Sequence, residues 1–210
     1  MKKKEQIDAV RIRYGLNDAI AGQIRQIGTK KIYPRGGRIL NVGEPMDCLL
    51  FMLSGAVKQV KYLEDGTEIV NTLHYRPGDA VIPIEYDLFH TVDSGTEIVA
   101  IQQTEILCIP NEAIIGAMKE SHEVMQLVFS VFNDYRRWYA EFHFFLSAFR
   151  SNLKGLLEYM IGSDPYIMAN AGLEDMASFV GVSYYHLSRT RKELRMEKPD
   201  LFESLALYEI

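Results

Sequence analysis

Three features of this 210-residue sequence predict an α+β fold. Short apolar runs broken by turn residues fill residues 29–110, a pattern typical of a barrel, roll or sandwich. A helical pattern follows over roughly 111–161, with a break near 150–152. A helix-turn-helix pattern occupies 173–196. We therefore expect an N-terminal double-stranded β-helix or jelly roll, a long helix and a C-terminal helical domain.

Composition narrows the class of protein. Apolar residues make up 48% of the chain, which is enough for a packed core. There is no run of eighteen apolar residues and no apolar stretch after the lysine-rich start, so we expect no membrane span, no signal peptide and a cytoplasmic protein. The net charge of −5 argues mildly against a nucleic-acid binder unless basic residues gather locally.

Cysteine and histidine spacing argues against a metal centre or an enzyme. The two cysteines, Cys48 and Cys108, lack C-x-x-C spacing and cannot supply the four ligands of an iron–sulfur cluster or a structural zinc; we interpret them as small buried residues. The five histidines never come closer than sixteen residues, unlike a cupin metal site. No phosphate loop or nucleophile elbow is present, so we expect no cofactor and no catalysis.

Along the chain, a helix is expected over about 6–27 and strands follow it. The strongest hairpin signal is Asp65-Gly66, which lies between two strand-like runs. The strand candidates are Ile32, Ile39-Leu40, Leu49 to Leu53, Val57 to Tyr62, Ile69 to His74, Val81-Ile82, Glu97 to Gln102 and Glu105 to Ile109.

The long helix carries a heptad seam. Its members step by four, then alternately by three and four, and the stretch over 119–149 would be roughly 45 Å long. An aromatic seam of this length exceeds what a small roll can cover, although part of it would pack on the β-domain. The predicted dimerisation residues are Val124, Val128, Val131, Tyr135, Trp138, Phe142 and Phe145, and Phe149 continues the seam.

The helix-turn-helix pattern has a buried face and a turn. Leu173, Met176, Ala177 and Val180 recur at helical spacing in the first helix. Gly181 allows a left-handed turn. The next helix has Ser183 as its expected N-cap and Leu187 and Leu194 as its buried positions.

The outward face of the second helix is expected to bind DNA. An arginine near the start of such a helix can pair with guanine, which contributes about 1–3 kcal/mol of discrimination. From 183 to 198 there are five cations against two acids. The candidate DNA-binding residues are Ser183, Tyr184, Tyr185, His186, Ser188, Arg189, Arg191, Lys192 and Arg195.

The order and spacing of these parts resemble the Crp/Fnr family of bacterial transcription regulators. In the roll the resemblance depends on Gly43-Glu44, Phe51-x-Leu53-x-Gly55-x-Val57, Asp65-Gly66-x-Glu68 and Pro77-Gly78-Asp79. The resemblance implies a cyclic-nucleotide-binding-like sensor domain over 1–118, a dimerisation helix over 119–149 and a DNA-binding domain over 150–210. It also implies base reading by Tyr184, Tyr185 and Arg189, with Ser183 and His186 beside them.

The sequence departs from the family pattern where relatives hold a cyclic nucleotide. The Gly-Glu pair expected for the ribose is replaced by Ile82-Pro83, and Asp93-Ser94-Gly95-Thr96 stands where an arginine is expected for the phosphate. No lysine or arginine occurs over 77–118. Because a phosphate needs a cation or a nest of amides, we expect that cyclic nucleotides do not bind.

The C-terminal end also departs from the family pattern. Many relatives carry a β-hairpin wing there, but residues 196–210 show no strand-turn-strand pattern. This weakens the expected affinity for DNA without removing it.

The function expected from the sequence is a homodimeric, sequence-specific regulator bound to double-stranded DNA, with RNA polymerase as a partner that the resemblance allows. An effector, if there is one, would be an apolar or neutral metabolite. The alternative is an adaptor that does not bind DNA and acts through a protein partner; Tyr184, Tyr185 and the negative net charge favour it.

Overall fold

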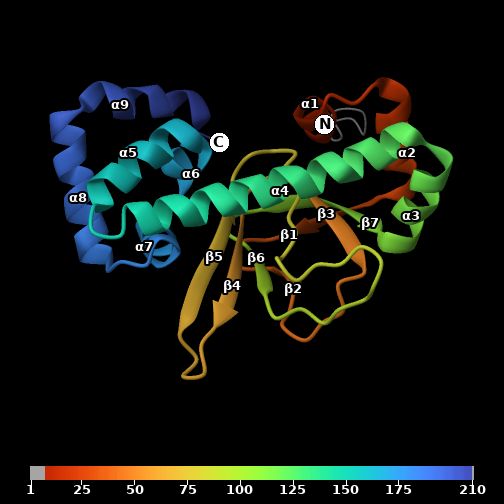
Figure 1. Cartoon of the computed structure of the whole chain (residues 1–210), viewed down its shortest axis with the longest axis horizontal. Coiled ribbons are helices and arrows are strands. Elements are labelled where there is room, and N and C mark those ends of the chain that lie inside the picture. Colours follow the sequence, from red (N-terminus) through yellow and green to blue (C-terminus); the bar gives the residue numbers. More distant parts are fainter. Residues whose placement is uncertain (1–7, 210) are drawn as a thin grey trace.

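A computed structural model describes residues 8–209 of the chain (Figure 1). Its centre is a β-roll made of two antiparallel sheets, with strand orders β1-β7-β3 and β2-β6-β4-β5. The strands are β1 (Thr29–Tyr33), β2 (Arg38–Leu40), β3 (Cys48–Ser54), β4 (Val57–Tyr62), β5 (Glu68–His74), β6 (Glu97–Ala100) and β7 (Thr104–Pro110).

The roll agrees with most of the predicted strands. The β4–β5 hairpin turns through Asp65-Gly66 as expected, with Gly66 at a φ of 82° and the Thr67 amide donating to the Asp65 carboxylate. Val81-Ile82 is not a strand, because Ala80 makes only an isolated bridge to Phe51 and the chain then continues as a loop to β6. Both residues are nevertheless buried, which explains the apolar run.

Three short helices close one end of the roll. They are α1 (Asp8–Tyr14), α2 (Asp18–Ile27) and α3 (Asn111–Glu120). Residues 6 and 7 of the predicted first helix lie outside the described residues. Gly78, at a φ of 90°, lets α1 approach closely, because a Cβ there would lie 2.5 Å from the Ala9 carbonyl oxygen.

One long helix, α4 (His122–Ala148), crosses the roll and links the two ends of the molecule (Figure 1). The predicted helical stretch breaks not only after α4 but also at Ser121. The Ser121 hydroxyl accepts from the Val124 amide at 3.3 Å and so caps α4. A polar capping residue inside an apolar pattern was the missed signal for this break.

The C-terminal part is helical throughout. Its elements are α5 (Leu153–Ser163), α6 (Pro165–Asn170), α7 (Leu173–Val180), α8 (Tyr184–Glu197), α9 (Pro199–Glu203) and the 3-10 helix η1 (Ser204–Tyr208). As expected, no strand follows α8 within residues 8–209. No helix in this described range combines the length and apolar character needed to cross a membrane.

One hydrophobic cluster joins the roll to the C-terminal helices. Roll residues Ala56, Val70, Leu73 and Tyr75 are buried together with side chains of α4, α5, α6, α7 and α8. The C-terminal helices therefore share a core with the sensor roll and are not attached through α4 alone.

Candidate DNA interface and effector site

The α7–α8 pair is built as the sequence predicts. Gly181 ends α7 in the left-handed conformation at a φ of 74°, and its amide bonds to the Ala177 and Ser178 carbonyls. The Ser183 hydroxyl accepts from the His186 amide at 3.3 Å and caps α8. Leu187 and Leu194 are fully buried, so the orientation of α8 on the domain is fixed.

Most of the predicted DNA-binding side chains lie on the exposed side of α8. Tyr185 is 83% exposed and the Arg189 side chain is 74% exposed. Tyr184 packs edge-on against Tyr185 at 5.6 Å between ring centroids. Among the described residues, the guanidinium of Arg189 pairs only with Glu193, at 3.8 Å and one helical turn away, so Arg189 can exchange that partner for a base. Also exposed are Ser183, His186, Lys192 and Arg195.

Arg191 behaves differently from the other candidates. Its Nη2 donates to the Met168 carbonyl of α6 at 3.2 Å, and burial lowers the pKa of its guanidinium. Ser188 is half-buried. Arg191 therefore ties α8 to α6 instead of facing outward. Helical spacing alone placed it at the edge of the outward face and could not show which way its long side chain turns.

The predicted seam on α4 faces the protein's own chain. Val124, Val128 and Val131 are at most 3% exposed and belong to the core formed with α1, α2, α3 and β3. Of the remaining seam residues, Tyr135 is partly buried against that core. Trp138 and Phe142 belong to the cluster shared with the C-terminal helices. The ring of Phe145 stacks on that of Tyr159 at 3.6 Å between centroids.

Within the single chain, this packing covers Val124, Val128, Val131 and Phe142, whereas Tyr135, Trp138 and Phe145 are half-buried and stay predicted dimer contacts. The heptad pattern correctly identified a buried face, but it cannot tell whether the covering surface comes from the same chain or from another. The opposite face of α4 is the one that the chain's own residues leave uncovered near Val124 and Val128.

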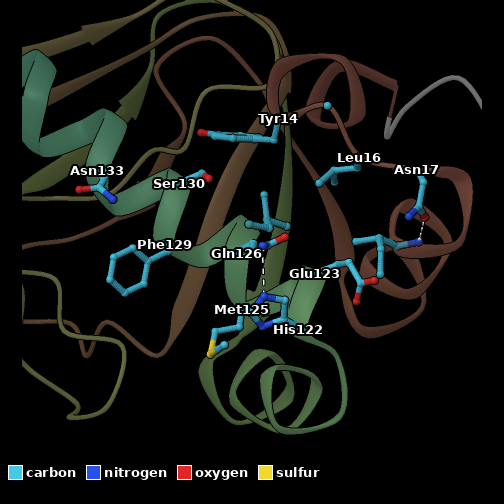
Figure 2. A pocket seen from close by; sticks show the side chains of 13 residues that line it. Tyr14, Leu16, Asn17, His122, Glu123, Met125, Gln126, Phe129, Ser130 and Asn133 are labelled. Carbon is cyan, nitrogen blue, oxygen red and sulfur yellow. Dashed lines mark hydrogen bonds between the residues drawn. The ribbon is translucent and has the colours of Figure 1, made fainter.

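The opposite face of α4 carries an apolar ridge between two grooves. Phe129 is 70% exposed and Met125 is 40% exposed. One groove, of about 610 Å³, lies between α4 and the turn after α1, where Tyr14 and Leu16 contribute to its wall (Figure 2). The other, of about 590 Å³, lies between α4 and the loop 85–89. Phe129 lines both grooves, so it is the crest between them.

Residues 93–96, where the family resemblance predicts the phosphate contacts, lie against a carboxylate. The Thr96 hydroxyl donates to Glu85 Oε1 at 2.6 Å, and Lys61 Nζ lies 3.5 Å from Glu85 Oε2. Burial alone would raise the pKa of Glu85, but the contacts with Thr96 and Lys61 hold this pKa below its ordinary value. The loop therefore presents a negative charge. The nearby Arg38 is likewise paired, with Glu97.

The interior of the roll contains buried polar side chains. Gln59 Nε2 donates to the Ile82 carbonyl at 3.2 Å and to His74 Nε2 at 3.1 Å, and burial lowers the pKa of His74 to about 4, which keeps it neutral. Gln59 Oε1 and Thr72 Oγ1 are buried and find no hydrogen-bond partner among the described residues. Sequence patterning could not reveal these two atoms, because their isolation depends on the packing of both sheets.

A polar seam lies where α1, the roll, α4 and the C-terminal helices meet. Arg13 Nε lies 3.2 Å from Asp79 Oδ1, and Arg76 reaches Asp164 at 3.9 Å. Burial raises the pKa of Asp79 to about 7, and the pKa of Asp164 is raised for the same reason. The seam was not predicted, because its members are spread over the sequence.

The fold and this site define a class: a β-roll joined by a long helix to a helix-turn-helix domain. Residues 30–121 match the family model described as "Cyclic nucleotide-binding domain". A comparison with curated protein sequences gives no match.

Solved structures share the fold over most of the chain. FixK2 from Bradyrhizobium japonicum is 17% identical, with a TM-score of 0.68 over 81% of this chain and 86% of that one. The catabolite activator protein of Thermus thermophilus is 19% identical, with a TM-score of 0.54 over 90% and 87%. A putative regulator of the crp/fnr family from Eubacterium rectale is 17% identical, with a TM-score of 0.61 over 90% and 88%.

Residues 30–121 are therefore similar to a cyclic nucleotide-binding domain, and the chain shares the fold of solved Crp/Fnr family transcription regulators. The expected fold class, an N-terminal β-domain followed by a long helix and a C-terminal helical region, is confirmed.

Proposed function

We propose that this protein is a homodimeric, sequence-specific DNA-binding transcription regulator whose sensor domain does not bind cyclic nucleotides. The observation that carries the proposal is the exposed face of α8, where Arg189, Tyr184 and Tyr185 project from a helix whose buried side is anchored by Leu187 and Leu194. We assign no catalytic role and place the protein in the cytoplasm, with double-stranded DNA as its partner and RNA polymerase as a further one.

The DNA contacts divide by position on α8. Arg189 is the expected base reader because its side chain is long, exposed and weakly held. Lys192 and Arg195 lie further along the helix and are expected to contact phosphates. Arg191 is removed from the set because its guanidinium bonds to α6.

The dimer is proposed to form through the Phe129 ridge of α4. A two-fold axis near this residue would place the crest of each copy in a groove of the other, which is the self-complementary arrangement that a symmetric dimer requires. Met125 and Phe129 are large apolar side chains left exposed in the single chain, and their burial would supply the driving force.

The negative charge beside residues 93–96 supports the proposal that cyclic nucleotides do not bind. The Glu85 carboxylate contacts Thr96, Lys61 is paired with Glu85, and Arg38 is paired with Glu97. An entering phosphate would meet a negative group and no free cation among these residues. A neutral or apolar molecule therefore remains the class of effector that we propose.

The test is selection of bound duplexes from a random DNA pool. The wild-type protein is compared with Arg189→Ala and with Arg25→Ala, a matched control that removes the same charge from the exposed surface of α2. We expect a two-fold-symmetric motif with half-sites about 10 base pairs apart, kept by the control and lost in Arg189→Ala. Salt-sensitive retention without a motif in all three proteins would overturn the proposal.

The exposed tyrosine pair favours one second candidate, an adaptor that docks a protein through α8. Tyr185 is the most exposed aromatic side chain of α8 and is the type of residue that anchors protein interfaces. The same selection separates the two functions, because an adaptor would yield no DNA motif.

A further inference from the structure

Two thiols that are 60 residues apart in the sequence come together in the roll. Cys48 begins β3 and Cys108 lies in β7, and these strands pair with Leu50 directly opposite Cys108. Cys48 is two residues from Leu50 on a regular stretch of the strand, so its side chain points to the same face of the sheet as that of Cys108. The two cysteines are therefore diagonal neighbours on one face.

The same two residues line one small pocket. Its volume is about 80 Å³, and Tyr33, Tyr86 and Pro83 help to enclose it. Cys108 is buried and Cys48 is half-buried, so the pocket has a closed end and an accessible end. Both cysteines are free thiols, and the chain contains no others.

The spacing of diagonal neighbours is poor for a disulfide. Such residues have Cα atoms about 7–8 Å apart, whereas disulfides usually need about 4.4–6.8 Å. A metal ion held between two sulfurs bridges a longer sulfur–sulfur distance than a disulfide does. Two sulfur–metal bonds of about 2.3 Å in a line separate the sulfurs by about 4.6 Å, whereas the sulfurs of a disulfide are about 2.05 Å apart.

We propose that Cys48 and Cys108 form a two-thiolate site for a soft metal cation that prefers linear coordination, namely Cu(I), Ag(I) or Hg(II). Thiolates select soft cations, and no further ligand is required for a linear complex. Binding forms two sulfur–metal bonds and releases two thiol protons, with no change of oxidation state.

The charges around the pocket fit ions of this class. A divalent ion with two thiolates is neutral and suits the apolar wall formed by Leu50 and Val81. A monovalent ion leaves one negative charge, and because both Lys31 and Asp47 line the pocket, the neutral complex of a divalent ion is the better fit. Harder ions such as Zn²⁺ would need two more ligands, and no group of three or more acidic, histidine or cysteine residues suited to a metal occurs in the described residues.

The inference stands apart from the proposed DNA binding and is tested without DNA. Full-length protein receives one equivalent of Hg(II), and native mass spectrometry follows its loss to added glutathione. The wild type is compared with Cys48→Ser, Cys108→Ser and the double variant. Because the second thiolate acts within the same molecule, we expect the wild type to keep the ion at a glutathione concentration at least about 100-fold higher than either single variant does.

A second measurement uses the wild type alone, so that it does not depend on how the variants fold. X-ray absorption of the protein loaded with one mercury per chain should show two sulfur neighbours at about 2.3 Å. One sulfur with a halide or oxygen neighbour, saturation at one mercury per two chains, or equal loss from the wild type and the single variants would each overturn the proposal.

Discussion

Replacing Phe179 with alanine tests whether the sensor roll and the DNA-binding helices fold as one unit. Phe179 belongs to α7 and is 5% exposed. Its ring stacks on Phe142 of α4 at 4.4 Å between centroids and an interplanar angle of 6°, and on Trp138 at 6.5 Å. The roll residue Val70 is buried in the same cluster, so the cavity left by the substitution would affect both halves of the molecule.

The expected magnitude follows from the size of that cavity. Truncating a buried phenylalanine costs about 3–5 kcal/mol, a large share of the about 5–15 kcal/mol that stabilises a typical domain. With a urea dependence of about 2 kcal/mol per molar, the midpoint should fall by about 2 M. Combining Phe179→Ala with Phe142→Ala should show a coupling of about 0.5–1.5 kcal/mol, because each substitution removes the partner of the other.

The assay is urea unfolding followed by two probes. Trp138 is the only tryptophan and lies in the stack, so its fluorescence reports the junction, while far-ultraviolet circular dichroism reports all helices and strands. We expect both transitions to coincide in the wild type and to shift together in the variant. Tyr185→Ala is the control, since that side chain is 83% exposed and its loss should change stability by less than about 0.5 kcal/mol. A fluorescence shift that leaves a separate, unshifted transition in circular dichroism would refute the shared core.

Three further predictions concern the dimer, the polar seam and α8. Replacing the exposed Phe129 of α4 with aspartate should convert a dimer into monomers in sedimentation velocity with little change in secondary structure, and a dimer that persists would exclude the ridge as the interface. Because burial raises the pKa of Asp79 to about 7, the folded state binds the proton more tightly than the unfolded state, so this group favours folding below about pH 4 and loses that contribution as the pH rises through 7. His74, with its pKa lowered to about 4, has the opposite effect on stability between about pH 6.5 and 4, so the contribution of Asp79 is isolated by comparing urea midpoints of the wild type and Asp79→Asn. The variant should gain stability relative to the wild type as the pH rises from 5 to 8. Parallel curves of midpoint against pH would contradict this. Arg191→Ala should lower thermal stability and leave the selected DNA motif unchanged, whereas Arg189→Ala should cost about 1–3 kcal/mol of base discrimination without a stability loss; the reverse pattern would show that the buried arginine is the reader.

Local signals explain most of what the sequence could predict. Gly181 and Ser183 determined the turn and the cap of the helix-turn-helix because their preferences arise from their own backbone and hydroxyl groups. Asp65-Gly66 determined the β4–β5 hairpin in the same way. Alternation and turn residues were enough for the fold class, since each depends only on neighbours in the chain.

Features that depend on long-range packing were not accessible from the pattern. The heptad pattern that includes Val128 correctly predicts a buried face of α4. Residues of the same chain cover this face, and periodicity does not identify the covering surface. Arg191 was placed among DNA contacts because its position on α8 did not show that Met168 accepts its hydrogen bond. Gln59 and Thr72 were not singled out as polar residues inside the roll, because the second sheet provides their environment.

The hairpin that rests on α7 also affects how such a protein can be recombined with others. Lys58 of β4 bonds to Asp175 at 3.0 Å, and the Val70 amide donates to the Ser178 hydroxyl at 2.9 Å. A chimaera that joins residues 1–149 to an unrelated DNA-binding module would expose the apolar side of β5 and leave the Val70 amide unbonded. Exchange of specificity between regulators of this architecture should therefore succeed only when the hairpin and α7 are transferred as a pair.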